Sequence, residues 1–220
     1  MTCPSVPGPP ADREPADREP ADREPADRAP VDRARVEAAV SEILTAVGED
    51  VARPGLAATP RRVADLYAEL FSGLGVDEVE LVRAGSVPAG AGQLGEVVVV
   101  RDVEFRSVCE HHLLPFTGVA HVAYVPRDAI VGLGAIPRVV DAVASRPQLQ
   151  ERLGEELAEA FSTGLDALGV LVVLDAAHGC VTTRGPRQVR STTVTLASRG
   201  VLGDAAARAE AVALIGAPRD

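Results

Sequence analysis

Residues 108–126 read VCEHHLLPFTGVAHVAYVP and combine two different patterns. The first half places a thiol, a carboxylate and two imidazoles at the consecutive positions 109–112. The second half, residues 119–125, alternates from Val119 through His121 and Ala123 to Val125, with the period of two that is typical of a β-strand. We therefore expect a strand over 119–125, preceded by a loop over 106–118 that carries the reactive side chains.

The segments on either side of this stretch predict the rest of the fold. Apolar residues recur at helical spacing in five segments, 31–47, 60–71, 136–145, 149–168 and 203–215. The Thr-Pro pair at 59–60 is typical of an N-cap followed by a first-turn proline. Strand-like segments are 96–105, 119–125, 170–177 and 191–197. Pairs of strands separated by helices predict an α+β fold, with an antiparallel four-stranded sheet and flanking helices.

Composition narrows the class of protein and its organisation. The chain has 220 residues, no lysine and a net charge of −10, which argues against a general nucleic-acid binder. Residues 1–30 are rich in proline and repeat the unit ADREP, so we expect a disordered arm there and a folded domain over 31–220. No apolar run approaches the ~20 residues of a membrane span. Three cysteines without a signal peptide favour the cytoplasm.

A metal site is the first functional prediction. Cys109 and His112 have the spacing of two ligands in one tight loop, and Cys180 directly follows a different predicted strand. Two cysteines and one histidine favour Zn²⁺. Three protein ligands leave the fourth position of a zinc ion to water, as in catalytic sites, and lower the pKa of that water toward ~7.

Three further histidines and one carboxylate have open roles. His111 and His178 lie within two residues of a predicted ligand, and each could either transfer protons or only orient the ligands. His121 lies on a strand without ligand-like neighbours, so we expect a structural role. Glu110 either tethers a histidine or the loop, or has a purely structural role.

Three motifs resemble those of the GTP cyclohydrolase I family. They are VCEHHLLPFTGVAHVAYVP at 108–126, RPQLQERL at 146–153 and HGCVTTRG at 178–185, and the similarity spans roughly residues 36–200. The resemblance implies a tunnelling fold, in which subunits contribute four-stranded sheets to an oligomeric barrel and two pentamers form a homodecamer. It also implies that water attacks C8 of the guanine of GTP, that formate leaves, and that 7,8-dihydroneopterin triphosphate forms as an entry to pterins and folate.

The resemblance also implies roles for individual residues. It assigns the zinc ion to Cys109, His112 and Cys180, and the acid–base steps to His111 and His178, with His178 nearest the purine N7. Substrate-binding positions are Leu133, Gln150, Glu151, Arg62, Arg138 and Arg184. Among these, Glu151 accepts hydrogen bonds from the guanine edge, and the three arginines hold the triphosphate. Without the resemblance, Glu151 would be a helix-start acid and each arginine a surface residue.

The chain departs from the family at three positions, which in the family are two lysines at the phosphates and a serine placed to help the ribose rearrangement. The family sequence Gly-Leu-Ser-Lys reads Gly-Leu-Gly-Ala at 132–135, so a serine is replaced by Gly134 and a lysine by Ala135. A second lysine is replaced by Asp65. Each lost contact would weaken triphosphate binding by about 1.5–3 kcal/mol. Compensation by nearby arginines is possible at 61, 187 and 190.

The sequence is therefore compatible with three functions. The first is a GTP cyclohydrolase I with a rearranged phosphate site. The second is a paralogue that opens the imidazole ring of a less phosphorylated or modified guanine nucleotide. The third is a non-catalytic oligomer that binds a purine. Retention of all three predicted ligands and both histidines favours an enzyme over the third function.

Overall fold

A computed structural model of the protein describes residues 31–90 and 95–218. The predicted arm, 1–30, lies outside the described residues. The helices are α1 (Arg33–Ala46), α2 (Thr59–Leu70), α3 (Glu78–Ala84), α4 (Ala135–Ala144), α5 (Gln150–Leu165), α6 (Gly179–Thr182) and α7 (Ala205–Ile215), with a 3-10 turn η1 (Val201–Gly203). The strands are β1 (Ser86–Pro88), β2 (Val98–Cys109), β3 (Pro115–Val125), β4 (Ala129–Val131), β5 (Pro147–Gln148), β6 (Gly169–His178) and β7 (Thr193–Gly200).

The main sheet has the order β5-β2-β3-β6-β7. Its four long strands β2, β3, β6 and β7 are antiparallel throughout, which confirms the predicted α+β class and four-stranded antiparallel sheet. The two-residue strand β5 runs parallel to the end of β2 and adds a fifth member that the sequence pattern does not indicate. Strands β1 and β4 form a separate two-stranded sheet.

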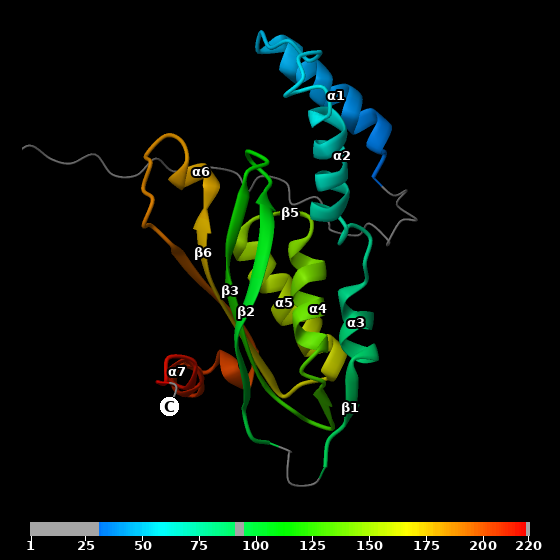
Figure 1. Cartoon of the computed structure of the whole chain (residues 1–220). Helices are drawn as coiled ribbons and strands as arrows, with labels where there is room; N and C mark the ends of the chain where they lie inside the picture. Colours follow the sequence, from blue (N-terminus) through cyan, green and yellow to red (C-terminus); the bar gives the residue numbers. More distant parts are fainter. Residues whose placement is uncertain (1–30, 91–94, 219–220) are drawn as a thin grey trace, which may run out of the picture.

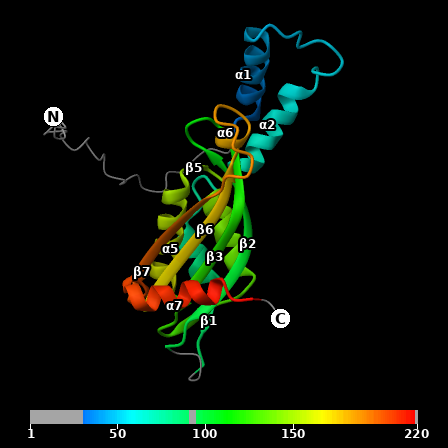
Figure 2. The ribbon, with the colours of Figure 1, turned by 90° about the vertical axis from the view of Figure 1, so that its left-hand side faces the viewer.

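The helices α3, α4 and α5 cover one face of this sheet (Figure 1). Their apolar residues at helical spacing, such as Ile136 and Val140 on α4 and Leu157 and Phe161 on α5, are fully buried against the strands. On the opposite face, α7 and η1 pack across one end of the strands (Figure 2). Burial of these apolar side chains is the main stabilising term for the fold.

At the other end of the molecule, α1 and α2 form a helical pair that projects beyond the sheet (Figures 1 and 2). Asp32 caps α1 by accepting from the Arg35 N–H at 3.0 Å. Helix α2 begins one residue earlier than predicted: Ala58 is the N-cap, Thr59 is the first helical residue, and Thr59 makes no capping hydrogen bond. The ion pair between Arg33 and Asp65, at 3.2 Å, joins the two helices.

One predicted segment is wrong in its extent. Residues 106–118 were expected to form a loop, but β2 continues to Cys109 and β3 begins at Pro115, so only 110–114 turn. The extended strand buries a polar residue, Ser107, whose hydroxyl is satisfied inside the core by donating to the Ala144 carbonyl at 2.7 Å. Among the helices of the described residues, none is long and apolar enough to cross a bilayer.

Candidate metal centre

The turn between β2 and β3 presents two of the predicted ligands. Cys109 closes the turn with its own backbone, since its N–H donates to the Leu114 carbonyl at 2.9 Å and its carbonyl accepts from the Leu113 N–H at 2.8 Å. Leu113 has a φ of 52°, in the left-handed region that a tight turn needs and that leucine rarely adopts. This geometry places His112 beside Cys109, so that the two side chains project from the same turn.

The third predicted ligand reaches the turn through the register of the sheet. Antiparallel pairing of β3 with β6 sets Phe116 opposite His178, which brings the start of α6 next to the turn. Gly179 allows this approach, because a Cβ at that position would lie 2.6 Å from the Pro115 carbonyl oxygen. Cys180 follows directly on α6 and faces the turn.

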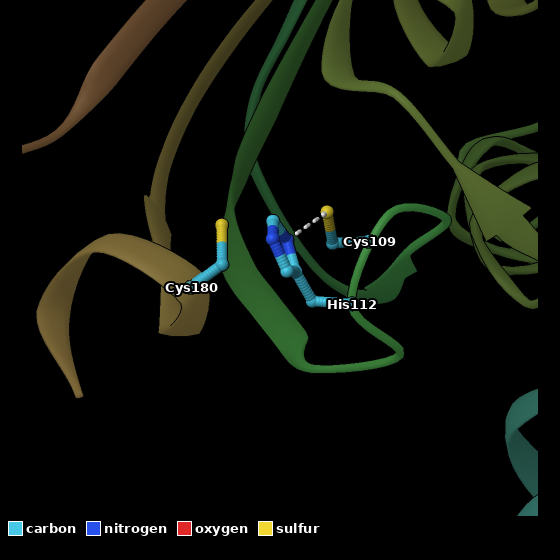
Figure 3. A group of neighbouring side chains, drawn as sticks. All are labelled: Cys109, His112 and Cys180. Carbon is cyan, nitrogen blue, oxygen red and sulfur yellow. Dashed lines mark hydrogen bonds between the residues drawn. The ribbon is translucent and has the colours of Figure 1, made fainter. Parts of the chain in front are cut away.

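The sulfur and nitrogen donors of Cys109, His112 and Cys180 all lie within 4.8 Å of one another (Figure 3). Cys109 Sγ and His112 Nδ1 are 3.9 Å apart. Burial and the adjacent Cys109 thiol raise the pKa of the Cys180 thiol. A divalent cation reverses both effects because it stabilises the thiolates, so this donor set fits a metal ion that accepts sulfur and nitrogen ligands.

His178 lies beside the cluster with its imidazole fixed on two sides. The ring stacks on Phe116, with centroids 4.6 Å apart and planes 6° from parallel. Its Nε2 is 2.7 Å from Gln150 Oε1. Burial lowers the pKa of His178, and the negative charge of Glu151 opposes that shift only in part. The histidine is therefore held mainly neutral at neutral pH.

Gln150 decides which nitrogen of His178 carries the proton. The Gln150 amide nitrogen donates to the carbonyls of Leu174 at 3.2 Å and Thr193 at 2.8 Å, so its oxygen is the atom that faces His178. Because an amide oxygen only accepts, His178 donates through Nε2 and leaves Nδ1 as the basic nitrogen. Gln150, which the sequence predicted as a substrate-binding residue, thus has its buried side-chain amide occupied in orienting this histidine.

The remaining polar residues of the turn differ in exposure. His111 is exposed and lies edge-on to His112, with ring centroids 6.1 Å apart. Glu110 forms an ion pair with Arg152 on α5, which answers the question left open by the sequence: the carboxylate tethers the turn to this helix. His121 lies on β3, where its Nδ1 accepts from the Asp102 backbone N–H at 3.1 Å, in keeping with the expected structural role.

The predicted substrate-binding residues fall into two groups. Arg184 reaches the cluster, with Nη2 2.9 Å from His112 Nε2, and Glu151 is close enough to His178 to affect its pKa. The second group is exposed and consists of Arg62 on α2, Arg138 on α4 and Leu133 before α4. Within the described residues, no contact joins this group to the cluster.

The structure also shows which residues surround the three positions that depart from the family pattern. Ala135 begins α4 and is 4% exposed, packed in the main core. Gly134 is the N-cap of that helix. Asp65 pairs with Arg33 and lies 4.0 Å from Arg61, so Arg61 already has a carboxylate partner.

Sequence reasoning missed the groups that support the site, Phe116, Gln148 and Arg152. Their importance depends on the strand register and on contacts between α5 and the turn, which spacing along the chain does not reveal. For Arg152 the one available signal was its position inside the RPQLQERL motif.

The α+β fold and the Cys-His-Cys donor set at the end of its sheet define a protein with a site that can hold a metal ion. The family description GTP cyclohydrolase I matches residues 36–216, and the chain belongs to this family. It is 66% identical over 180 residues to a protein named GTP cyclohydrolase 1 from Leifsonia xyli subsp. xyli, covering 81% of this chain and 93% of that protein.

Proteins of the same name in more distant bacteria are also similar. The one from Bacillus subtilis is 51% identical over 174 residues, covering 78% of this chain and 90% of its own. The one from Caldanaerobacter subterraneus subsp. tengcongensis is 48% identical over 183 residues, covering 82% of this chain and 95% of its own. The resemblance seen in the three sequence motifs is thereby confirmed along most of the chain.

Proposed function

We propose that this protein is a zinc-dependent GTP cyclohydrolase I that converts GTP and water to 7,8-dihydroneopterin triphosphate and formate. The observation that carries the proposal is the convergence of Cys109, His112 and Cys180 within 4.8 Å in a chain that belongs to this family. Two thiols and an imidazole favour zinc over harder cations. When bound there, zinc supplies an electrophilic centre that activates water for attack on C8 of the guanine.

His178 is the proposed acid–base group at the purine. Its Nε2–H is fixed by Gln150, and its neutral Nδ1 can take up a proton and return it to the purine N7 as the ring opens. Stacking on Phe116 keeps the ring from rotating, so this nitrogen keeps one direction. His111, which is exposed on the same turn, is the second proposed proton carrier.

Substrate binding is proposed for Glu151 at the guanine edge, for Leu133 against the base, and for Arg62, Arg138 and Arg184 at the triphosphate. Electrostatics support the arginines. Nine arginines pair with carboxylates within 4.0 Å, whereas these three have no such partner among residues 31–90 and 95–218. Guanidinium groups without a carboxylate partner can form bidentate contacts with phosphate.

The segment after the metal centre adds to this positive charge. Between Asp175 and Asp204 the chain has no acidic residue and four arginines, Arg184, Arg187, Arg190 and Arg199, although the whole protein carries a charge of −10. Arg199 pairs with α5, but Arg187 and Arg190 have no carboxylate partner in the described part of the chain. They are the proposed replacement for the lysines that the family has at positions 65 and 135.

The proposed assembly is the homodecamer of the family, and the proposed compartment is the cytoplasm. Exposed apolar side chains on the edge strand β7, Val194 and Leu196, support burial against another subunit. Free thiols at Cys109 and Cys180 suit a reducing compartment.

The test is a mass-spectrometric product assay of the zinc-loaded protein with GTP, GDP, GMP and guanosine in parallel. Dihydroneopterin triphosphate and formate from GTP, with GTP preferred, support the proposal. Because the two family lysines are absent, turnover of GMP or guanosine in preference to GTP would instead identify a paralogue for less phosphorylated nucleotides. Absence of formate from all four compounds, with zinc bound, would overturn enzymatic function.

A further inference from the structure

Arg152 connects the turn of the metal centre to the helical layer beneath the sheet. Its Nη2 forms the ion pair with the Glu110 carboxylate and also donates to the Pro147 carbonyl at 3.1 Å. Its Nε donates to the side-chain oxygen of Gln148 at 3.0 Å. One guanidinium group therefore binds the turn, strand β5 and a buried amide at the same time.

The buried amide extends these contacts into the protein. Gln148 is 1% exposed, and its amide nitrogen donates to Glu156 Oε2 at 2.6 Å and to the Val143 carbonyl at 3.1 Å. Glu156 in turn pairs with Arg146 Nη2 at 3.1 Å, and Arg146 pairs with Glu78 of α3 at 3.3 Å. The Arg146 side chain is only 19% exposed, so this end of the network is shielded from water.

Glu110 is held by its backbone as well as by its carboxylate. Its N–H donates to the Gln148 carbonyl at 3.1 Å, next to the parallel pairing of Cys109 with Gln148. Cys109 and His111 are the two neighbours of Glu110 in the chain. A displacement of Glu110 therefore moves Cys109 and the turn relative to Cys180, which lies on the separate helix α6.

The charges of the network are suited to positioning rather than to overall stability. The Arg152 and Glu110 side chains are 42% and 30% exposed, and ion pairs at that exposure contribute little to the free energy of unfolding. The geometry is nevertheless specific, because a planar guanidinium with several donors in fixed directions reaches three acceptors that lysine could not reach together.

From these contacts we propose that Arg152 is a positioning residue of the metal centre, which fixes Glu110 and thereby the direction in which Cys109 and His112 present their donor atoms toward Cys180. The proposal deepens the proposed function but concerns metal affinity, which is measured without substrate. A protein that bound zinc and opened no purine would still test it.

The experiment is a zinc-competition titration of the full chain with a chromophoric chelator. Arg152→Gln is expected to raise the Kd for zinc about 10-fold, because supporting contacts of metal ligands typically change affinity by about 10- to 100-fold and this one acts through Glu110. Glu110→Gln removes the same ion pair from the other side and is expected to raise the Kd by a similar factor. The double variant should be no weaker than the weaker single variant.

Arg199→Gln is the matched control. Arg199 pairs with Glu155 at 2.7 Å and Glu159 at 3.1 Å on the same helix α5, away from the metal centre. The zinc Kd of the Arg199→Gln variant should equal that of the wild type. Zinc affinity within twofold of the wild type in both Arg152→Gln and Glu110→Gln would overturn the proposal, even if the melting temperature fell. If Arg152→Gln does not fold, Glu110→Gln alone decides.

Discussion

At the scale of single residues, the orientation of His178 makes its role testable. Gln150 and Phe116 fix the imidazole, and Nδ1 remains as its basic nitrogen. His178→Ala removes a proposed proton carrier and no predicted metal ligand. We expect formate release from GTP to fall by about 10²- to 10⁴-fold, the range typical of general acid–base catalysis, while the zinc content per subunit stays the same. Formate release and metal content are measured on the same sample.

His121→Asn is the control for that variant, because His121 is the one histidine that lies outside the turn and the start of α6. It should keep wild-type formate release. Near-normal activity of His178→Ala would show that another group transfers the proton. Loss of zinc from that variant would show that His178 supports the metal instead, which is the alternative that spacing along the chain left open.

The reactive residues themselves could be predicted from the sequence, whereas their supports could not. Cys109, His112 and Cys180 have a spacing and a chemistry that point to a metal, and the structure brings them together. The roles of Gln150 and Phe116 depend on which residues face each other across β3, β6 and the start of α5. The local pattern of 108–126 does not show which residues of β6 and α5 lie opposite it, since that register also depends on burial of the whole sheet.

At the scale of elements, the long periodic segments were predicted well and the short ones were not. Helices α4 and α5 and strand β6 lie within a few residues of their predicted ranges. Elements of two to seven residues, such as α3, β5 and α6, are too short to show a period and form because their neighbours pair with them or cover them. The hairpin of β2 and β3 extends into the predicted loop for the same reason.

Removal of single charges tests most directly whether the segment 183–192 binds phosphate. Its Arg187 N–H donates to the Arg184 carbonyl at 3.2 Å, which folds the segment close to the residue that contacts His112. We expect Arg187→Gln and Arg190→Gln each to raise KM for GTP about 10- to 100-fold with kcat nearly unchanged, because each loses one charge-assisted contact with phosphate.

Arg208→Gln serves as the comparison, since Arg208 lies on α7 at the opposite end of the sheet, where its side chain donates to the Gly203 carbonyl at 2.9 Å. Its KM should not change. A higher salt concentration should reduce the difference in KM between the wild type and the two loop variants, because exposed charges are screened. An unchanged KM in both loop variants would exclude Arg187 and Arg190 from phosphate binding and leave the loss of the family lysines uncompensated there.

At the scale of the whole molecule, His121 couples global stability to pH. It lies on the sheet face opposite α4 and α5, where β2 has an irregularity and Asp102 adopts a φ of 58°. Burial lowers the pKa of His121, the positive charge of Arg101 lowers it further, and the negative charge of Asp175 opposes both effects. The neutral ring also accepts the Asp102 N–H, which a protonated Nδ1 could not do.

The sign of the pH dependence follows from this shift. The unfolded chain takes up a proton on His121 near pH 6.5, whereas the folded protein takes it up only at lower pH. Between these two values the unfolded state binds more protons, so stability is complete above about pH 6.5 and falls as the pH drops toward the folded-state pKa. His178 shifts in the same direction and contributes equally to wild type and to a His121 variant.

His121→Asn isolates the contribution of one residue, because the asparagine oxygen can accept from Asp102 but does not titrate. We expect the urea midpoint of the wild type to fall more between pH 7.5 and pH 5.5 than the midpoint of the variant. Urea unfolding followed by circular dichroism at both pH values measures the difference. Equal falls in the two proteins would mean that His121 titrates alike in the folded and unfolded states, so that burial beside Arg101 does not control its protonation.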